Sequence, residues 1–206
     1  MTPAAFAALH PRLYRLAERG SLDSIRRHGL LPAADLARLA GHPLPPERRA
    51  AALRLTLPDG TPVTITDNAP LSMRALGGIL DDGLAPADWM AMLNARVFFW
   101  PDRALGAGNL AARLRLGYRS EWHVFDTARL LAPVWDRAEV APINTGATLR
   151  AAARRGRATF APLATLDWDA WRRARPTRAL DRAKEVTVRG PVPHAADAIE
   201  AIEPAR

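Results

Sequence analysis

Short apolar runs bounded by proline, glycine or aspartate recur along the chain and predict a set of strands. The strongest run, residues 96–100 (RVFFW), is apolar almost throughout and stops at Pro101, which is typical of a central strand buried on both faces. The sequence Pro-Asp-Gly at 58–60 separates two further runs and predicts a hairpin turn. The expected strands are residues 12–17, 53–57, 62–66, 96–100, 122–125, 138–141, 158–161, 185–188 and 198–202.

Apolar residues at helical spacing, with start and stop signals, predict helices between these strands. Ser21 is expected to cap a helix that Gly29 ends. Pro86 begins a clearer helix, because proline suits the first helical position. The expected helices are residues 22–28, 32–39, 47–52, 70–80, 86–93, 105–116, 127–131 and 167–173. Short strands with inserted helices and no regular βαβ rhythm predict an α+β fold.

The length of 206 residues suits one domain, residues 1–206. The chain has no cysteine, no secretory signal at its N-terminus and no apolar stretch of the roughly 20 residues that span a membrane. We therefore expect a cytoplasmic protein without membrane contact.

The formal net charge of +8 suggests an anionic partner, but all basic residues except Lys184 are arginine. Such a bias also arises from a G+C-rich genome, so the charge alone does not indicate nucleic-acid binding. One arginine-rich segment keeps both interpretations open, because it suits a solvated loop or contact with a nucleic-acid acceptor. Its basic residues are Arg150, Arg154, Arg155 and Arg157.

Several common catalytic motifs are absent. The chain has no glycine-rich phosphate loop ending in lysine, and no G-x-S-x-G sequence around a nucleophilic serine. Its five histidines are scattered, and none forms the i, i+4 pair that binds a metal. Kinase, serine-hydrolase and metalloenzyme functions are therefore disfavoured, and no metal site is expected.

Three short segments in a fixed order carry the remaining chemistry. They are residues 13–15 (LYR) with 24–32 (SIRRHGLLP), residues 96–100, and residues 185–193 (EVTVRGPVP). In this order they resemble the three motifs of the ADP-ribosyltransferase superfamily. The first is similar to the cholera-toxin-like branch, the second to the poly-ADP-ribose-polymerase-like branch, and the third to bacterial toxins that modify DNA thymidine.

This resemblance implies a split β-sheet core around a cleft for NAD, which is a substrate rather than a permanent cofactor. It implies an NAD-dependent transfer of ADP-ribose to an unknown acceptor, with Glu185 as the catalytic residue. The residues it places against NAD are Tyr14, Arg15, Asn94, Arg96, Phe99 and Trp100. The position of Arg15 usually holds histidine in the family pattern. Enzymes that modify protein arginine carry a second Glu or Gln where this chain has Ala183, so protein arginine is not the expected acceptor.

The residue types suit this chemistry. Loss of nicotinamide from NAD builds positive charge on the ribose, as in other glycosyl transfers. A fixed carboxylate stabilises that charge, an arginine grips phosphate or ribose oxygens, and aromatic faces enclose the nicotinamide ring.

Each assignment has a simpler alternative. Glu185 also suits a solvated strand start paired with Arg182, and Arg15 a surface position on its strand. The aromatic residues of the 96–100 strand also suit plain core packing, Asn94 a helix C-cap, and residues 144–146 (NTG) a turn.

Two other functions stay open. The chain could be a catalytically inactive module of the same fold that binds a nucleotide or nucleic acid. It could also be similar to tRNA 2′-phosphotransferases, which use NAD, but it lacks their paired histidines. Residues 93–100 (LNARVFFW) and 142–146 (PINTG) further resemble signatures of a bacterial family of unknown function.

Overall fold

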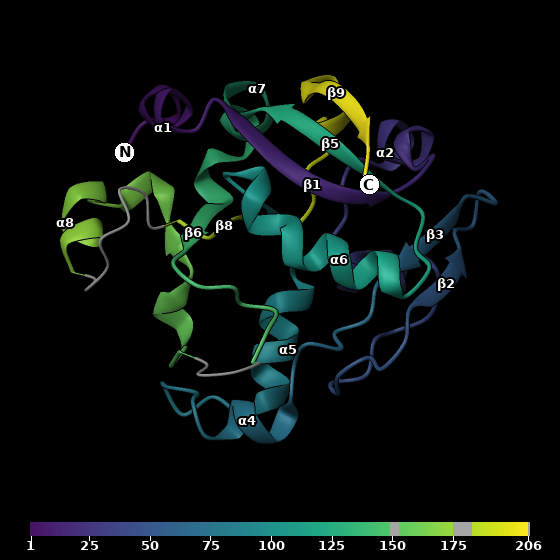
Figure 1. Ribbon diagram of the computed structural model, residues 1–206, viewed down its shortest axis with the longest axis horizontal. Helices are drawn as coiled ribbons and strands as arrows, with labels where there is room; N and C mark the ends of the chain where they lie inside the picture. The colour runs from purple at the N-terminus through teal and green to yellow at the C-terminus, as the bar shows by residue number, and fades with distance from the viewer. Residues whose placement is uncertain (149–152, 175–182, 206) are drawn as a thin grey trace.

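Two antiparallel sheets form the centre of the structure, a computed structural model that describes residues 1–148, 153–174 and 183–205. The first sheet has the strand order β1 (Arg12–Glu18), β5 (Ser120–Asp126) and β9 (Ile199–Pro204). In Figure 1 these strands lie side by side at the top of the molecule, so segments from the beginning, middle and end of the chain form one sheet.

The second sheet contains the strands of the second and third motifs. Its order is β4 (Arg96–Phe99), β8 (Glu185–Arg189), β6 (Ala138–Ala141) and β7 (Ala161–Pro162). Within this sheet β4 is an end strand, not the central strand that its sequence predicts. It is nevertheless well buried, because the core covers its Val97 and Phe99 side chains.

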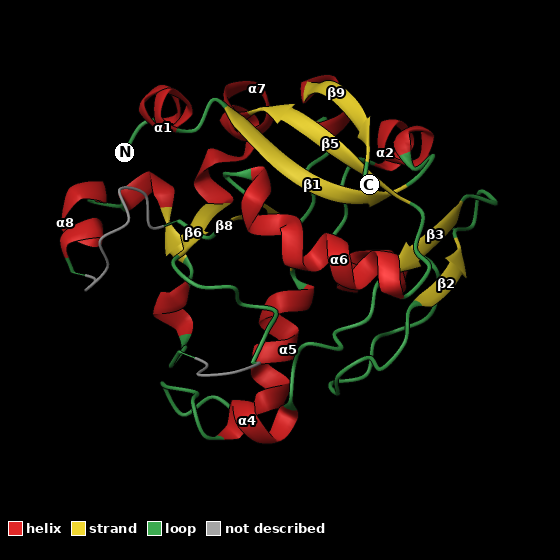
Figure 2. Cartoon of the chain, viewed as in Figure 1, coloured by secondary structure: helices red, strands yellow, loops and turns green. Residues whose placement is uncertain are grey.

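The two sheets meet where β1 and the end of β4 exchange hydrogen bonds. Tyr14 N donates to Trp100 O at 2.9 Å, and Trp100 N donates to Tyr14 O at 2.8 Å. This bridge places β1, β4 and β8, the strands of the three motifs, next to one another. A separate hairpin of β2 (Leu53–Thr56) and β3 (Pro62–Ile65) has the predicted Pro-Asp-Gly turn and lies apart from the two sheets in Figure 2.

Helices cover the sheets, and most of them begin at a residue that suits a helix start. Asp126 Oδ1 accepts from Arg129 N at 2.7 Å and so caps α7. The α-helices are α1 (Pro3–Leu9), α2 (Leu22–His28), α3 (Ala33–Leu39), α4 (Met73–Gly77), α5 (Pro86–Asn94), α6 (Ala107–Arg115), α7 (Thr127–Leu131) and α8 (Trp168–Arg173). The 3-10 helices are η1 (Arg103–Gly106), η2 (Ala132–Arg137), η3 (Arg157–Thr159), η4 (Leu163–Thr165) and η5 (Ala195–Ala198). This mixture of helices and antiparallel sheets confirms the α+β class.

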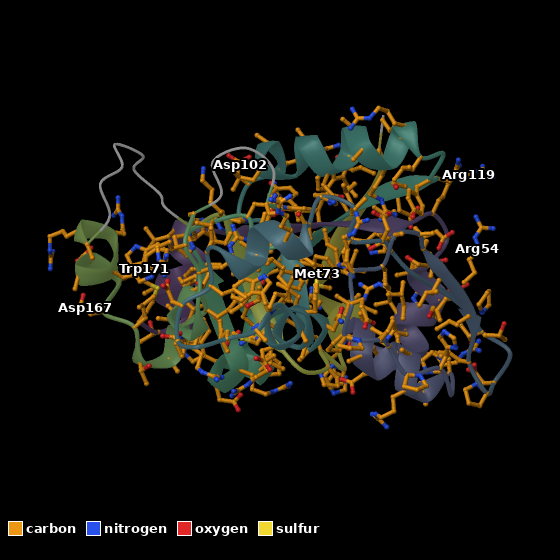
Figure 3. All side chains as sticks on the ribbon, turned by 90° about the horizontal axis from the view of Figure 1, so that it is seen from below. Arg54, Met73, Asp102, Arg119, Asp167 and Trp171 are labelled. Carbon is orange, nitrogen blue, oxygen red and sulfur yellow. The ribbon has the colours of Figure 1, made fainter. Side chains whose placement is uncertain are left out.

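Two hydrophobic clusters fill the interior. The larger one joins both sheets, with Leu13 and Phe125 from the first and Val97, Phe99 and Val186 from the second. The smaller one packs α4 and α5 against the opposite face of the second sheet. Figure 3 shows that Trp171 of α8 and Asp167, which caps this helix, lie at one end of the molecule, and Arg54 and Arg119 at the other.

Three local predictions are wrong. Residues 47–52 form no helix, because the backbone of Arg49 pairs with Asn68 and its side chain turns inward. In the predicted strand 158–161, residues 158 and 159 belong to η3, and only Ala161 joins the sheet. Ser21 makes no capping bond, because its backbone is already helical (φ −75°, ψ −4°), whereas a capping residue normally has an extended backbone. The helix at 70–80 is confirmed only for residues 73–77, and α1 was not predicted.

Candidate functional site

Glu185 shares a row across the sheets with Tyr14 and Trp100. Phe99 pairs with Val186, so continuing this register by one residue sets Trp100 beside Glu185. Trp100 in turn bridges Tyr14. Because neighbours in such a row project from the same face of a sheet, these three predicted site residues lie on one face.

Arg15 follows Tyr14 on β1, and Phe99 precedes Trp100 on β4. Because successive side chains of a strand alternate between its two faces, both residues project from the opposite face. Phe99 is 1% exposed and packs edge-on against Phe125 in the larger core cluster. It therefore does not line the same surface as Trp100, and this part of the predicted NAD contact set is corrected to core packing.

The Glu185 carboxylate is buried and held by a single residue. Thr145 donates two hydrogen bonds to Oε2, from its backbone N at 3.2 Å and from Oγ1 at 2.6 Å. No described residue donates to Oε1. Burial raises the pKa of Glu185 from its ordinary 4.5 to about 7, although the Thr145 bonds and the charge of Arg155 act in the opposite direction. A carboxylate that is 7% exposed is not the solvated strand start of the simpler alternative.

Two large side chains fix the position of Thr145 by hydrogen bonds to its backbone. Its carbonyl accepts from Trp89 Nε1 at 3.3 Å and from Arg155 Nη1 at 3.2 Å. Arg155 also donates to the carbonyls of Ala147 and Ala153, and its guanidinium lies 5.7 Å from the Trp89 ring centroid. We call Glu185, Thr145, Arg155 and Trp89 the Glu185 cluster.

The Arg15 guanidinium lies where β1 and β4 separate. Its Nη1 donates to Phe98 O at 3.0 Å, a carbonyl of the neighbouring sheet. Burial, and then repulsion from Arg113, lowers the pKa of Arg15 to about 10. Arg15 forms no ion pair with a carboxylate in the described ranges, and Glu185 is not among the charges that act on it. The structure thus brings Arg15 near the row without bringing it to the carboxylate.

His123 is opposite Arg15 on β5 and is completely buried. Its Nε2 lies 2.9 Å from Glu121 Oε1, and Gly20 N donates to the same oxygen at 3.3 Å. Burial lowers the pKa of His123 despite the Glu121 contact, so the imidazole is neutral near pH 7. This arrangement adds a polar group beside Arg15 without adding charge.

The other two predicted NAD contacts are occupied by internal bonds. Asn94 Oδ1 accepts from Arg49 Nη1 at 2.9 Å, inside the protein. Arg96 forms a two-pronged ion pair with Glu139, at 2.7 Å and 3.1 Å, and stacks over the Phe160 ring at 4.0 Å. These bonds connect structural elements and leave neither side chain free to bind a ligand in this conformation.

Of the three predicted nucleic-acid contacts that the structure describes, Arg154 and Arg157 face solvent and Arg155 does not. Arg155 is 2% exposed and belongs to the Glu185 cluster, so it does not reach a phosphate. Arg154 is exposed but pairs with Asp81, and Arg157 is exposed on η3. Arg150 lies outside the described residues. The expectation of one basic patch is therefore corrected for Arg155.

Two cavities lie away from the Glu185 cluster. One, of about 420 Å³, is next to residues 69–73 and Arg48. The other, of about 260 Å³, lies between α7, η2 and the loop after β8. Across residues 1–148, 153–174 and 183–205, no group of His, Asp and Glu suited to a metal ion is found. Among the helices in that part of the chain, none combines the length and apolar character needed to cross a bilayer.

Sequence reasoning identified Glu185 but missed what holds it. Residues 144–146 form the turn that the simpler alternative predicts, but the sequence does not reveal that Thr145 donates to the carboxylate. The sequence groups Arg155 with arginines of a solvated loop or a nucleic-acid contact, and it does not mark Trp89 as a partner of Thr145. The one available signal was the PINTG segment, which stood out as a signature without a role.

Comparison with known proteins gives a family but no activity. No curated protein and no solved structure matches the chain significantly. The model of DUF7002, a family of unknown function, matches residues 11–199. Because this match covers most of the chain, the protein belongs to the DUF7002 family.

Proposed function

We propose that the protein is an ADP-ribosyltransferase-like enzyme that uses NAD as substrate, with Glu185 as the catalytic carboxylate. The observation that carries the proposal is the buried Glu185 beside the bridge that joins the two sheets, in one row with Tyr14 and Trp100. The adjacent order of β1, β4 and β8, and the two sheets joined at that bridge, support the split-sheet fold that the motifs imply.

The carboxylate suits the charge that the reaction creates. When the bond between ribose and nicotinamide breaks, its electron pair leaves with nicotinamide and positive charge develops on the ribose. The pKa of Glu185 is raised to about 7 because its buried surroundings stabilise the anion poorly. A positive charge arriving next to this group would therefore be stabilised more strongly than by an exposed carboxylate. The acceptor, whose identity is open, then bonds to the ribose and loses its proton.

Arg15 projects from the opposite face to Glu185, but its guanidinium reaches the edge of the row through its bond to Phe98 O, and we assign it to the anionic part of NAD. Its guanidinium is partly buried, repelled by Arg113 and without a carboxylate partner in the described ranges. A pyrophosphate would supply the missing countercharge, and the planar guanidinium suits its oxygens. Tyr14 and Trp100 are both only partly buried and project from the same face as Glu185, so they are the aromatic surfaces available to nicotinamide.

One observation favours a second candidate, an inactive nucleotide-binding module of the same fold. Glu185 is 7% exposed and lines neither of the cavities described above. An NAD molecule can reach the carboxylate only if the segments that cover it open. A module that binds a nucleotide nearby, without chemistry at Glu185, does not need this opening.

Two measurements separate these functions. NAD binding is measured by calorimetry and nicotinamide release by chromatography, with water or added nucleic acid as acceptor. The matched pair is Glu185→Gln, which keeps the side-chain shape, and Glu47→Gln, which removes an exposed carboxylate elsewhere. Glu185→Gln should lower release about a hundredfold or more and change NAD affinity little, because the ground-state ribose carries no positive charge. Arg15→Ala should weaken NAD binding first.

Each outcome has a defined meaning. Release that persists in Glu185→Gln would remove this residue from the mechanism. Binding without release in the wild-type protein would favour the inactive module. If the wild-type protein neither binds NAD nor releases nicotinamide, the enzyme proposal is wrong, and a module that binds another nucleotide or nucleic acid takes its place.

A further inference from the structure

The cavity of about 260 Å³ lies at the other end of β8 from Glu185 and shares no residue with the Glu185 cluster. Its apolar floor contains Leu130 from α7, Val134 from η2 and Val192 from the loop after β8. Each of these three side chains is 2% exposed and belongs to the larger core cluster, so the floor is rigidly packed.

The rim of the cavity is basic. Arg129, Arg137 and His194 line it, and none of its lining residues is Asp or Glu. The acidic group that the structure records near this rim is Asp197, whose Oδ2 lies 3.9 Å from His194 Nδ1. A small apolar hollow with a cationic rim favours a ligand that has an apolar body and an anionic head.

Arg137 is held in a fixed orientation by the turn that follows β8. Its Nη1 donates both hydrogens to main-chain carbonyls, to Arg189 O at 2.8 Å and to Pro191 O at 2.9 Å. Gly190 lies between them with φ +80°, and a Cβ there would stand 3.0 Å from Nη1. The turn therefore needs glycine both for its backbone and for its contact with the guanidinium.

These bonds leave the other edge of the guanidinium open. Nε and Nη2 of Arg137 have no hydrogen bond to any residue in the described ranges. This edge is the one that binds a carboxylate or phosphate through two parallel hydrogen bonds. Because the side chain is already oriented, little conformational entropy is lost when an anion binds.

We propose that this cavity binds a small organic anion, with its carboxylate or phosphate on Arg137 and an aromatic or aliphatic body on the apolar floor. The site is independent of NAD chemistry at Glu185. Its volume suits a body of about the size of one aromatic ring. The segment that builds it, residues 189–194 (RGPVPH), begins at the last residue of β8, so the third motif serves two separate sites.

The test uses four probes and protein-observed NMR with calorimetry on the full chain. Benzoate and phenyl phosphate carry the two anionic heads, benzamide is the neutral analogue, and inorganic phosphate lacks the apolar body. At least one of the two aromatic anions should bind with a dissociation constant of about 1 mM or tighter, and the better one identifies the head group. Benzamide and inorganic phosphate should bind at least about tenfold more weakly. The shifted resonances should include the amides of Val134 and Val192.

Arg137→Lys keeps the positive charge but cannot form the two parallel hydrogen bonds of a guanidinium, so it should weaken binding of the anion about tenfold. Arg115→Lys, on exposed α6, is the matched control and should bind like the wild-type protein. Arg129→Ala removes a rim charge that makes no side-chain bond to described residues, so it tests the rim if Arg137→Lys fails to fold. The proposal is overturned if no aromatic anion binds, if benzamide binds equally well, if neither rim variant weakens binding, or if the shifts map elsewhere.

Discussion

Replacing Glu185 by glutamine should make the protein more stable at alkaline pH. Glutamine keeps the shape of the side chain, and its carbonyl oxygen can still accept both hydrogen bonds from Thr145. The substitution removes the unfavourable free energy of burying a negative charge at a position that is 7% exposed.

The magnitude follows from the pKa of Glu185, which rises from an ordinary 4.5 to about 7 in the folded protein. Each pKa unit corresponds to about 1.4 kcal/mol, so the folded state loses about 3 kcal/mol of stability when the pH rises through this window. The folded protein binds the proton more tightly than the unfolded chain between these two pKa values. Stability from this group is therefore complete below pH 4.5, falls as the pH rises towards 7, and stays low above it.

The assay is denaturant unfolding followed by tryptophan fluorescence at about pH 4.5 and pH 8. The wild-type protein and Glu185→Gln should have similar free energies of unfolding at the lower pH, where Glu185 is mostly protonated. At the higher pH the variant should be more stable by about 3 kcal/mol. Glu47→Gln removes an exposed carboxylate and should not reproduce this gain.

A difference between wild type and variant that does not change with pH would refute the reasoning, and so would a variant that becomes less stable as the pH rises. Either result would mean that the buried carboxylate is compensated by its surroundings. The expected result would fit a functional residue, because groups retained for activity often reduce stability.

Two further predictions concern the framework around the site. Arg96→Met should destabilise the protein by about 3–5 kcal/mol, because it leaves Glu139 buried without its arginine partner. Adding Glu139→Leu should restore much of this stability, as measured by denaturant unfolding. A double variant as unstable as the single one would contradict the explanation. Gly29→Ala should cost about 2–4 kcal/mol, because its Cβ would stand 2.6 Å from a main-chain oxygen of the loop after β8 at φ +72°. Gly20→Ala, at φ +85° with nothing within 4 Å, should lose only about 1 kcal/mol, and equal losses would show that crowding is not the cause.

The structure confirms the sequence predictions where the signal acts locally. The helix that begins at Pro86, the hairpin turn at residues 58–60 and the helix at residues 127–131 all lie where the sequence places them. Proline geometry, turn residues and side-chain caps act within a few residues of the chain, so their effects can be recognised in a single sequence. The failed helix at residues 47–52 shows the limit, because contacts of Arg49 with Asn94 and Thr66 replace the local preference.

The candidate site divides in the same way. The sequence by itself determined that Glu185 begins a short strand, and the motif resemblance singled it out as the catalytic candidate. It could not determine that Thr145, forty residues away, holds the carboxylate, or that Arg155 and Trp89 fix Thr145. The strand register places Trp100 on the same face of the sheet as Glu185, whereas Phe99 projects from the opposite face into the core. Only the tertiary structure sets these partners and the burial that shifts the pKa, because both depend on segments that are distant along the chain and become neighbours when it folds.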